Sequence, residues 1–163
     1  MSRPRKSLEP GAARDLPAAY AAAVALLSRR DFASAELRAR LERRGFERSV
    51  VETALAELID EHVLDDARFA RHYIAYHAER GQGPLRVRTD LRARGLSVEL
   101  IEAALEGGPD WHALASEVRV RKFGPEIPAS WAEKTRQARF LQYRGFSSDH
   151  IRRALGPSFD PDD

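Results

Sequence analysis

Cysteine is absent from the 163 residues, and methionine and tryptophan are nearly so, with one and two copies. Without cysteine the chain forms no disulfide and offers no thiolate to a metal ion, which is typical of proteins of the reducing cytosol. No apolar run approaches the roughly 18 residues of a membrane span, and no signal-peptide core follows the basic N-terminus. We therefore expect a cytoplasmic protein with no membrane association.

Aromatic residues are also few, at 8%, whereas 43% of the chain is apolar and 32% is charged. This composition favours thin amphipathic helices over a thick globular centre. Both ends are rich in proline and in charge of one sign. We predict a flexible basic N-terminal tail over residues 1–16 and an acidic C-terminal tail over residues 157–163.

One phrase occurs three times at intervals of fifty residues: RRGFERSVVETAL at 43–55, ARGLSVELIEAAL at 93–105 and YRGFSSDHIRRAL at 143–155. Each copy places a leucine four residues before a glycine, and an apolar residue directly after it. The leucines are Leu41, Leu91 and Leu141, the glycines Gly45, Gly95 and Gly145, and the apolar residues Phe46, Leu96 and Phe146. Chance does not keep that register twice, so the chain contains an internal repeat.

The phrase has the pattern of a helix end followed by a new helix. A glycine takes the left-handed conformation just beyond a helix, and the apolar residue after it folds back onto the preceding leucine. Serines stand where the next helix begins: Ser49, Ser97, and Ser147 or Ser148. Because serine is a good N-cap, each phrase predicts a helix-turn-helix corner.

A further amphipathic helix precedes each corner, at 18–29, at 66–80 after Asp65 or Asp66, and at 111–123 after Asp110. The sequence therefore predicts an all-α protein of three tandem three-helix repeats at 17–63, 64–108 and 109–156. Repeats of this size cannot bury both faces of their helices alone, so we expect an elongated, curved array. A compact bundle of nine helices is the alternative.

Positive charge recurs on the second helix of each repeat, whereas the third helices of the first two repeats are acidic. The candidate binding surface consists of Arg68, Arg71, Arg80, Arg86, Arg88, Arg92, Arg136 and Arg139. Such a surface suits a polyanion or an acidic protein groove. The alternative is a solvated face with intrahelical ion pairs.

Residues 64–96, LDDARFARHYIAYHAERGQGPLRVRTDLRARGL, resemble the central signature of the RecX regulatory family. The first and third repeats resemble it too, so the similarity extends from about Tyr20 to Leu155. Ala33 is a departure, because many relatives have a serine before the second helix.

The resemblance implies a regulator rather than an enzyme. Members of this family are tandem three-helix repeats that bind the RecA recombinase and lie in the groove of its nucleoprotein filament. There they reduce strand exchange, ATP hydrolysis and co-protease action, and so regulate homologous recombination, DNA repair and the SOS response. The resemblance thus implies RecA as the partner of this chain. We expect the chain to be a monomer that makes weak, non-specific contact with single- or double-stranded DNA.

Neither catalytic residues nor sites for a metal or cofactor emerge from the sequence. The run DEHVLDD at 60–66 gathers four carboxylates around His62, but a helix end followed by an N-cap explains it better. RGQGPLR at 80–86 lacks the ending of a phosphate loop, and we expect its glycines to end one helix and Pro84 to begin the next. We expect the aromatic rings of Phe69, Tyr73, Trp111, Trp131 and Phe140 to lie in the core.

Two other functions stay open. The first is a DNA-binding regulator that reads DNA with the third helix of each repeat, although the acidic third helices of the first two repeats would repel phosphates. The second function is that of a helical scaffold for an unrelated partner.

Overall fold

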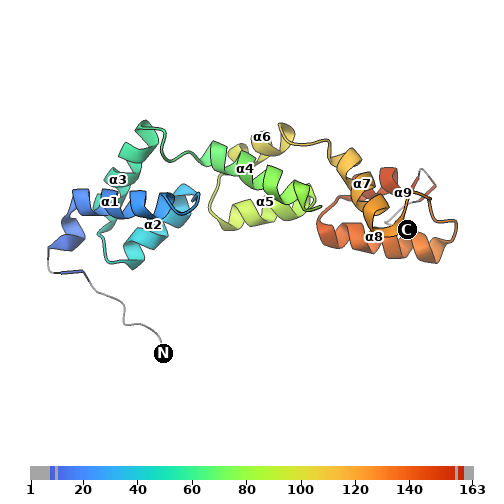
Figure 1. The fold of residues 1–163 in the computed structure, drawn as a ribbon, viewed down its shortest axis with the longest axis horizontal. Coiled ribbons are helices and arrows are strands. Elements are labelled where there is room, and N and C mark those ends of the chain that lie inside the picture. Colours follow the sequence, from blue (N-terminus) through green and yellow to red (C-terminus); the bar gives the residue numbers. More distant parts are fainter. Residues whose placement is uncertain (1–7, 10, 157, 160–163) are drawn as a thin grey trace, which may run out of the picture. The chain divides into compact units, whose positions relative to one another are not determined.

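The structure is a computed structural model of the chain, and it describes residues 8, 9, 11–156, 158 and 159 (Figure 1). The described residues form helices and no strand, so the predicted all-α class is confirmed. The elements are the 3-10 helix η1 (Ala12–Arg14) and the α-helices α1 (Leu16–Leu27), α2 (Ser34–Arg43), α3 (Arg48–Asp60), α4 (Asp66–Glu79), α5 (Pro84–Ala93), α6 (Val98–Glu106), α7 (Trp111–Phe123), α8 (Trp131–Arg144) and α9 (Ser148–Leu155).

The chain divides into two compact units, with the boundary inside α4. Unit 1 comprises Met1–Phe69 and Arg94–Leu96, and unit 2 comprises Ala70–Ala93 and Ser97–Asp163. The repeat boundaries and the curved array stay predictions. Residues 1–7, 10, 157 and 160–163, which belong to the predicted tails, lie outside the described residues.

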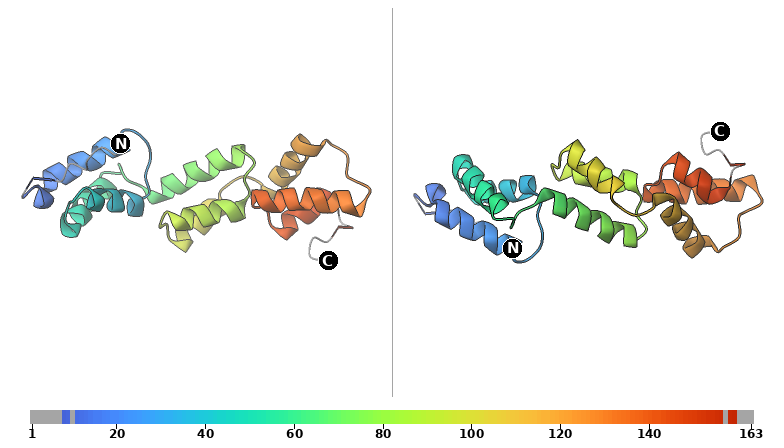
Figure 2. Two further views of the ribbon diagram at one scale, coloured as in Figure 1. Left: turned by 90° about the horizontal axis from the view of Figure 1, so that it is seen from below. Right: turned by 90° about the horizontal axis from the view of Figure 1, so that it is seen from above.

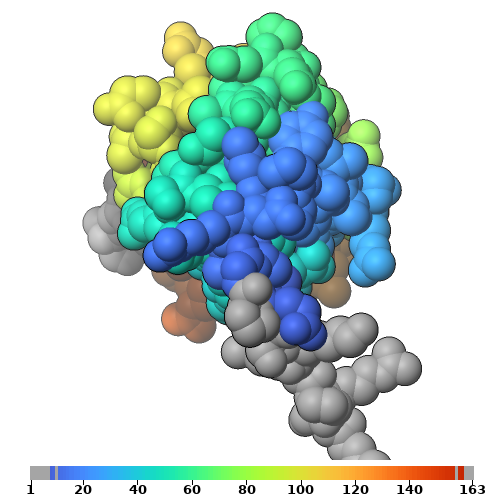
Figure 3. All heavy atoms as spheres, turned by 90° about the vertical axis from the view of Figure 1, so that its left-hand side faces the viewer, coloured from blue at the N-terminus to red at the C-terminus, as the bar shows by residue number. Residues whose placement is uncertain are grey.

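The core of unit 1 lies among α1, α2 and α3. Figure 3 shows these helices, coloured blue to cyan-green, gathered on the face turned to the viewer. Ala19 and Ala23 of α1 are fully buried, and their small side chains let α1 pack closely against α3. Leu37 and Leu41 of α2 complete this core. Leu8 packs against the same cluster, so part of the segment that the sequence assigned to a tail contacts the folded unit.

Unit 2 contains a second core, in which α7 and α8 pack against α9. Leu141, Phe146 and Leu155 are almost completely buried there. Phe159, from beyond α9, is also buried in this cluster. Trp131 stacks against Phe159 with ring centroids 5.0 Å apart, but its side chain is 52% exposed. The prediction of a core position for Trp131 was therefore wrong, because Trp131 begins α8 and its ring lies at the surface.

The helix caps follow the sequence in most places. Asp110 accepts from the backbone N–H groups of His112 and Ala113 at the start of α7, as predicted. Ser97 caps α6, and Ser147 caps α9. Ser49 is not a cap, because α3 already begins at Arg48 and no side chain caps it.

Ala33 stands at the N-cap of α2, and it has no side-chain acceptor for the free N–H groups. Asp66 replaces the missing cap from a distant part of unit 1. Its Oδ1 accepts from the backbone N–H of Ser34 at 2.7 Å and from the Ser34 hydroxyl at 3.0 Å. Asp65 accepts from the N–H of Arg68 and caps α4, so the two neighbouring aspartates begin different helices.

The three corner glycines have left-handed backbone conformations, with φ of 104° at Gly45, 84° at Gly95 and 95° at Gly145. The N–H of Phe46 donates to the carbonyl of Leu41 at 3.3 Å, and that of Phe146 to Leu141 at 3.1 Å. The six apolar residues of the phrase are all buried: Leu41, Leu91, Leu141, Phe46, Leu96 and Phe146.

Within unit 2, the last corner joins the start of α5. The N–H groups of Gly83 and Leu85 donate to the carbonyls of Arg144 and Gly145 at 2.8 and 2.9 Å. Backbone N–H groups at the start of α5, which have no acceptor within their own helix, thus donate to carbonyls at the end of α8 that have no donor within theirs. Figures 1 and 2 show α8 and α5 meeting end to end.

This joint is a backbone contact. A Cβ added to Gly83 would lie 2.4 Å from the carbonyl oxygen of Gly145, and one added to Gly145 would lie 2.5 Å from the Cβ of Arg86. Unit 1 has a contact at the equivalent repeat positions, where a Cβ on Gly95 would lie 2.5 Å from the Cβ of Ala35. Each of these two corners therefore packs against the start of the second helix of the preceding repeat.

Candidate functional site

Four of the eight arginines in the predicted surface are held by groups of the chain itself. Arg68 donates to the carbonyls of His62 and Val63, and so caps the end of α3. Arg80 lies 3.4 Å from the ring centroid of Tyr76. Arg136 forms an ion pair with Glu133 of its own helix at 2.7 Å.

Arg88 is the fourth, and it links α5 to α6. Its guanidinium donates to both carboxylate oxygens of Glu102, at 2.6 and 3.0 Å. These hydrogen bonds lower the pKa of the Glu102 carboxyl below its usual range. Fifty residues earlier, Arg38 and Glu52 form the same pair between α2 and α3. The pair is therefore a repeated structural link, and it neutralises charge that the sequence assigned to the binding surface.

Arg71, Arg86, Arg92 and Arg139 differ from the other four. All four residues are exposed, and within the described part of the chain their side chains form no ion pair, hydrogen bond or ring contact. Arg86 and Arg92 lie on α5, Arg139 lies on α8, and the joint brings these two helices together end to end. Their charges remain available to an external anion.

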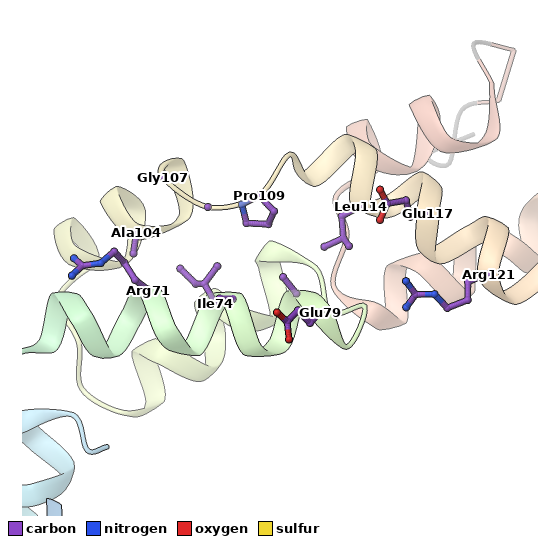
Figure 4. Close-up of a pocket in the computed structure, with 12 residues that line it drawn as sticks. Arg71, Ile74, Glu79, Ala104, Gly107, Pro109, Leu114, Glu117 and Arg121 are labelled. Carbon is purple, nitrogen blue, oxygen red and sulfur yellow. The ribbon is translucent and has the colours of Figure 1, made fainter. Parts of the chain in front are cut away.

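A groove of about 600 Å³ separates α4 from α7 in unit 2 (Figure 4). Ile74 and Ala78 of α4 and Leu114 of α7 form apolar parts of its wall. Arg71 and Arg121 lie toward its two ends in Figure 4, with Glu79 and Glu117 between them. The groove could accept an apolar side chain of a protein partner between charged groups. Sequence reasoning missed it, because no local pattern predicts which faces of α4 and α7 meet.

The acidic run at 60–66 serves the ends of helices. Helix α3 ends at Asp60, His62 takes the left-handed conformation with φ of 57°, and Asp65 caps α4. The prediction of a helix end followed by an N-cap is confirmed. Among the described residues, no group of three histidine, aspartate or glutamate side chains is arranged to hold a metal ion.

The RGQGPLR segment is a turn between two helices. Helix α4 ends at Glu79, Gly81 has φ of 77°, and α5 begins at Pro84. The structural interpretation of this segment is therefore confirmed.

Arg119 is a further residue that the sequence did not single out. It is only 3% exposed, and it donates to the carbonyls of Gly124, Pro125 and Glu126 and to Gln137. Burial lowers its pKa. Its function is to hold the loop between α7 and α8. The sequence did not predict that Arg119 is buried, because arginine is rarely buried even among apolar residues of a helix.

Helices, corners and exposed arginines together define a class: an all-α protein of serial three-helix domains with arginines on its surface. No helix in the described part of the chain is both long and apolar enough to cross a membrane. The models of the first, second and third three-helix domains of RecX match residues 19–58, 65–105 and 110–155. The chain belongs to the RecX family, a family of regulatory proteins rather than enzymes, and its three-helix domains are confirmed.

Similar proteins cover nearly all of the chain. The regulatory protein RecX of Halorhodospira halophila is 42% identical over 156 residues, which are 95% of this chain and 96% of that protein. RecX of Pseudomonas fluorescens is 41% identical over 82% of this chain and 86% of its own. The crystal structure of RecX from Lactobacillus salivarius has a TM-score of 0.76 at 19% identity, and covers 86% of this chain and 94% of that one.

Proposed function

We propose that the chain binds the RecA recombinase and its nucleoprotein filament, and inhibits strand exchange, ATP hydrolysis and co-protease action. Membership of the RecX family supports RecA as the partner. The observation that supports a contact surface is that four of the eight predicted arginines are exposed and form no ion pair, hydrogen bond or ring contact of their side chains within the described part of the chain: Arg71, Arg86, Arg92 and Arg139. Guanidinium groups bind phosphates and carboxylates bidentately, so this surface suits a filament of protein and DNA.

In this proposal the chain acts by binding alone, without catalysis. A monomer, a cytoplasmic location and weak, non-specific DNA contact belong to the same proposal. Arg68, Arg88 and Arg136 hydrogen-bond to other groups of the chain and contribute less to the contact. Arg80 lies over the ring of Tyr76, which leaves its charge in place. The three corners hold the helices that carry the surface.

The experiment is a titration of the chain into RecA assembled on single-stranded DNA, with ATP hydrolysis and filament length followed together. We expect the Arg86→Glu/Arg92→Glu variant to need about tenfold more protein for half-inhibition, because two charge-assisted contacts become repulsive. The matched control is Arg29→Glu/Arg43→Glu, which makes the same charge change at exposed positions of unit 1. It should inhibit like the wild type.

The paired arginine needs its own variant. Reversing Arg88 alone places two carboxylates against each other, so a loss of inhibition would combine binding with stability. Exchanging the partners, as Arg88→Glu/Glu102→Arg, retains the pair and reverses its direction. We expect this exchange to leave inhibition unchanged. Inhibition by the Arg86/Arg92 variant at wild-type concentrations would refute the proposed surface, and an inert wild-type chain would refute the function.

A further inference from the structure

Four basic side chains line a small hollow in unit 2, where three helices end. Arg80 follows the last residue of α4, Arg121 and Lys122 belong to the last turn of α7, and Arg144 ends α8. The hollow has a volume of about 140 Å³, and no acidic residue lines it. Within the described residues none of the four cations forms an ion pair.

Helix dipoles account for only part of this charge. The C-terminus of a helix carries about half a negative unit charge, and basic residues in the last turn offset it. Three helix ends thus supply about one and a half negative charges against four positive ones. Glu79 and Glu117 line the larger groove, as Arg121 also does, but neither glutamate lines the hollow or forms an ion pair with one of its cations. The hollow therefore retains an excess of positive charge.

Other contacts hold the cations in place without neutralising them. Arg144 donates to the carbonyl of Arg80 at 3.2 Å. Its guanidinium lies 5.3 Å from the ring centroid of Phe140, and the Lys122 ammonium lies 5.8 Å from the same ring. Arg80 stacks over Tyr76 on the other side. Cation–π contacts attract a cation without cancelling its charge, so the side chains keep their capacity for an anion.

Gly81 keeps the hollow open. It is buried, and a Cβ added there would lie 3.1 Å from Cγ2 of Val118 and 3.9 Å from Nη1 of Arg144. Any side chain at this position would therefore enter the space among the cations. The glycine also takes φ of 77°, which ends α4 and lets α5 begin beside α8.

We infer that this hollow binds a phosphate group. The four cations belong to three separate helix ends. The tetrahedral oxygens of a phosphate can therefore accept from more of them than the two coplanar oxygens of a carboxylate can. Sites for whole small molecules measure about 300 Å³ or more, so only the phosphate itself fits and the rest of its molecule lies outside. The phosphate comes either from a nucleic-acid strand or from a free ion. A strand as the source rests on the DNA contact of the proposed function and gives that contact a site, whereas binding of the free ion is independent of it, and neither needs the recombinase.

The test uses the full chain labelled with ¹⁵N, at constant ionic strength. One arm adds inorganic phosphate, and the other adds a single-stranded thymidine oligonucleotide. We expect the amide signals of Gly81 and Val118 to shift in at least one arm. A shift with both ligands identifies a general phosphate site, a shift with the oligonucleotide alone identifies a strand site, and a shift with phosphate alone identifies a free ion.

Variants then test whether the cations of the hollow bind the phosphate. Where the oligonucleotide binds, Arg121→Gln/Lys122→Gln should weaken it about tenfold, and should reduce the slope of log Kd against log salt by about 1.4. Where only the free ion binds, the same variant should abolish the amide shifts. The control Arg29→Gln/Arg43→Gln removes two exposed charges of unit 1 and should change neither measurement.

Three results would overturn the inference. The first is unmoved Gly81 and Val118 amides in both arms. The second is a double variant that binds like its control, and Lys122→Gln alone repeats that comparison if the double variant loses its fold. The third is displacement of phosphate or oligonucleotide by a hexaglutamate peptide at lower concentration than by phosphate itself, because the hollow would then prefer carboxylates.

Discussion

Asp66 illustrates how much a single residue can contribute from outside its own helix. It supplies the acceptor that Ala33 lacks at the start of α2, although it lies 32 residues beyond Ser34. The sequence correctly predicted that Asp65 or Asp66 would cap α4, and Asp65 does so. The second aspartate could not be assigned from sequence, because its partner depends on how α2 and the start of α4 pack.

Gly95 offers the sharpest test of a single position. We expect Gly95→Ala to lower the free energy of unfolding by about 2–4 kcal/mol, since φ of 84° strains any side chain and the new Cβ meets that of Ala35. Gly95→Val should cost more. Urea unfolding at equilibrium provides the measurement.

The Ala35 contact can be separated from the backbone strain by a double-mutant cycle. Ala35→Gly removes the one atom of the described residues, chain neighbours aside, that lies within 4 Å of the added Cβ. In that background Gly95→Ala should cost about 1–2 kcal/mol less, because only the strain remains. Additive effects would show that Gly95 does not pack against Ala35.

At the scale of elements, helix starts and ends were the most predictable part of the fold. The sequence predicted a helix at 111–123, and α7 is Trp111–Phe123. It placed the first helix at 18–29, whereas α1 is Leu16–Leu27, because Asp15 caps the helix earlier. Periodicity and caps are local signals, so they fix an element but not its neighbours. The joint of Gly83 with Gly145 depends on tertiary packing and had no such signal.

The start of α9 should make the core of α7, α8 and α9 sensitive to pH. Nδ1 of His150 lies 3.2 Å from the backbone N–H of Ser147, from which the neutral ring accepts. Burial, and secondly the neighbouring His112, lower the pKa of His150 below 6.5, against the opposing effects of Asp149 and Asp110. The unfolded chain therefore takes up a proton before the folded one does. Stability should be complete above about pH 6.5 and fall as pH drops toward the folded-state pKa.

Urea unfolding at pH 7.5, 6.5 and 5.5 measures this dependence. We expect the His150→Gln variant to have a flatter profile over that range, because its side-chain oxygen can still accept from Ser147 but does not titrate. The glutamates with lowered pKa values, such as Glu52 and Glu102, lose their contributions only below about pH 4.5. Equal slopes for wild type and variant would refute the role of His150.

At the scale of the whole molecule, the charge of a surface differs from its arginine count. The sequence identified eight arginines as a binding surface. In the structure, however, Arg88 donates to Glu102 and Arg68 donates to the carbonyl of His62, just after the end of α3. Counting charges along a helix cannot show this, because Glu102 lies fourteen residues from Arg88 on another helix. The sequence thus predicted that arginines form the candidate site, but only partly which of those arginines are free to contact a partner.

Cooperativity within unit 2 should follow from the end-to-end joint. We expect Gly145→Ala to increase amide hydrogen exchange at Val87 and Leu91 of α5, because its Cβ would lie 2.8 Å from the backbone nitrogen of Arg86. Gly124→Ala is the control, with φ of 92° and, chain neighbours aside, no atom of the described residues within 4 Å of the added Cβ. It should cost about 2 kcal/mol less and leave α5 protected. Equal exchange in both variants would mean that the joint does not couple the helices.

The contact of Gly83 with Gly145 also has a consequence for sequence divergence. Because backbone atoms meet there, side chains around the contact can change without altering the distance between the helices. In a saturation library we expect positions 83 and 145 to tolerate almost nothing, while exposed positions such as Thr89 and Gln142 accept most residues. A few intolerant glycines can then preserve an architecture while most of the surrounding sequence drifts, and the fold persists between proteins that share about a fifth of their residues.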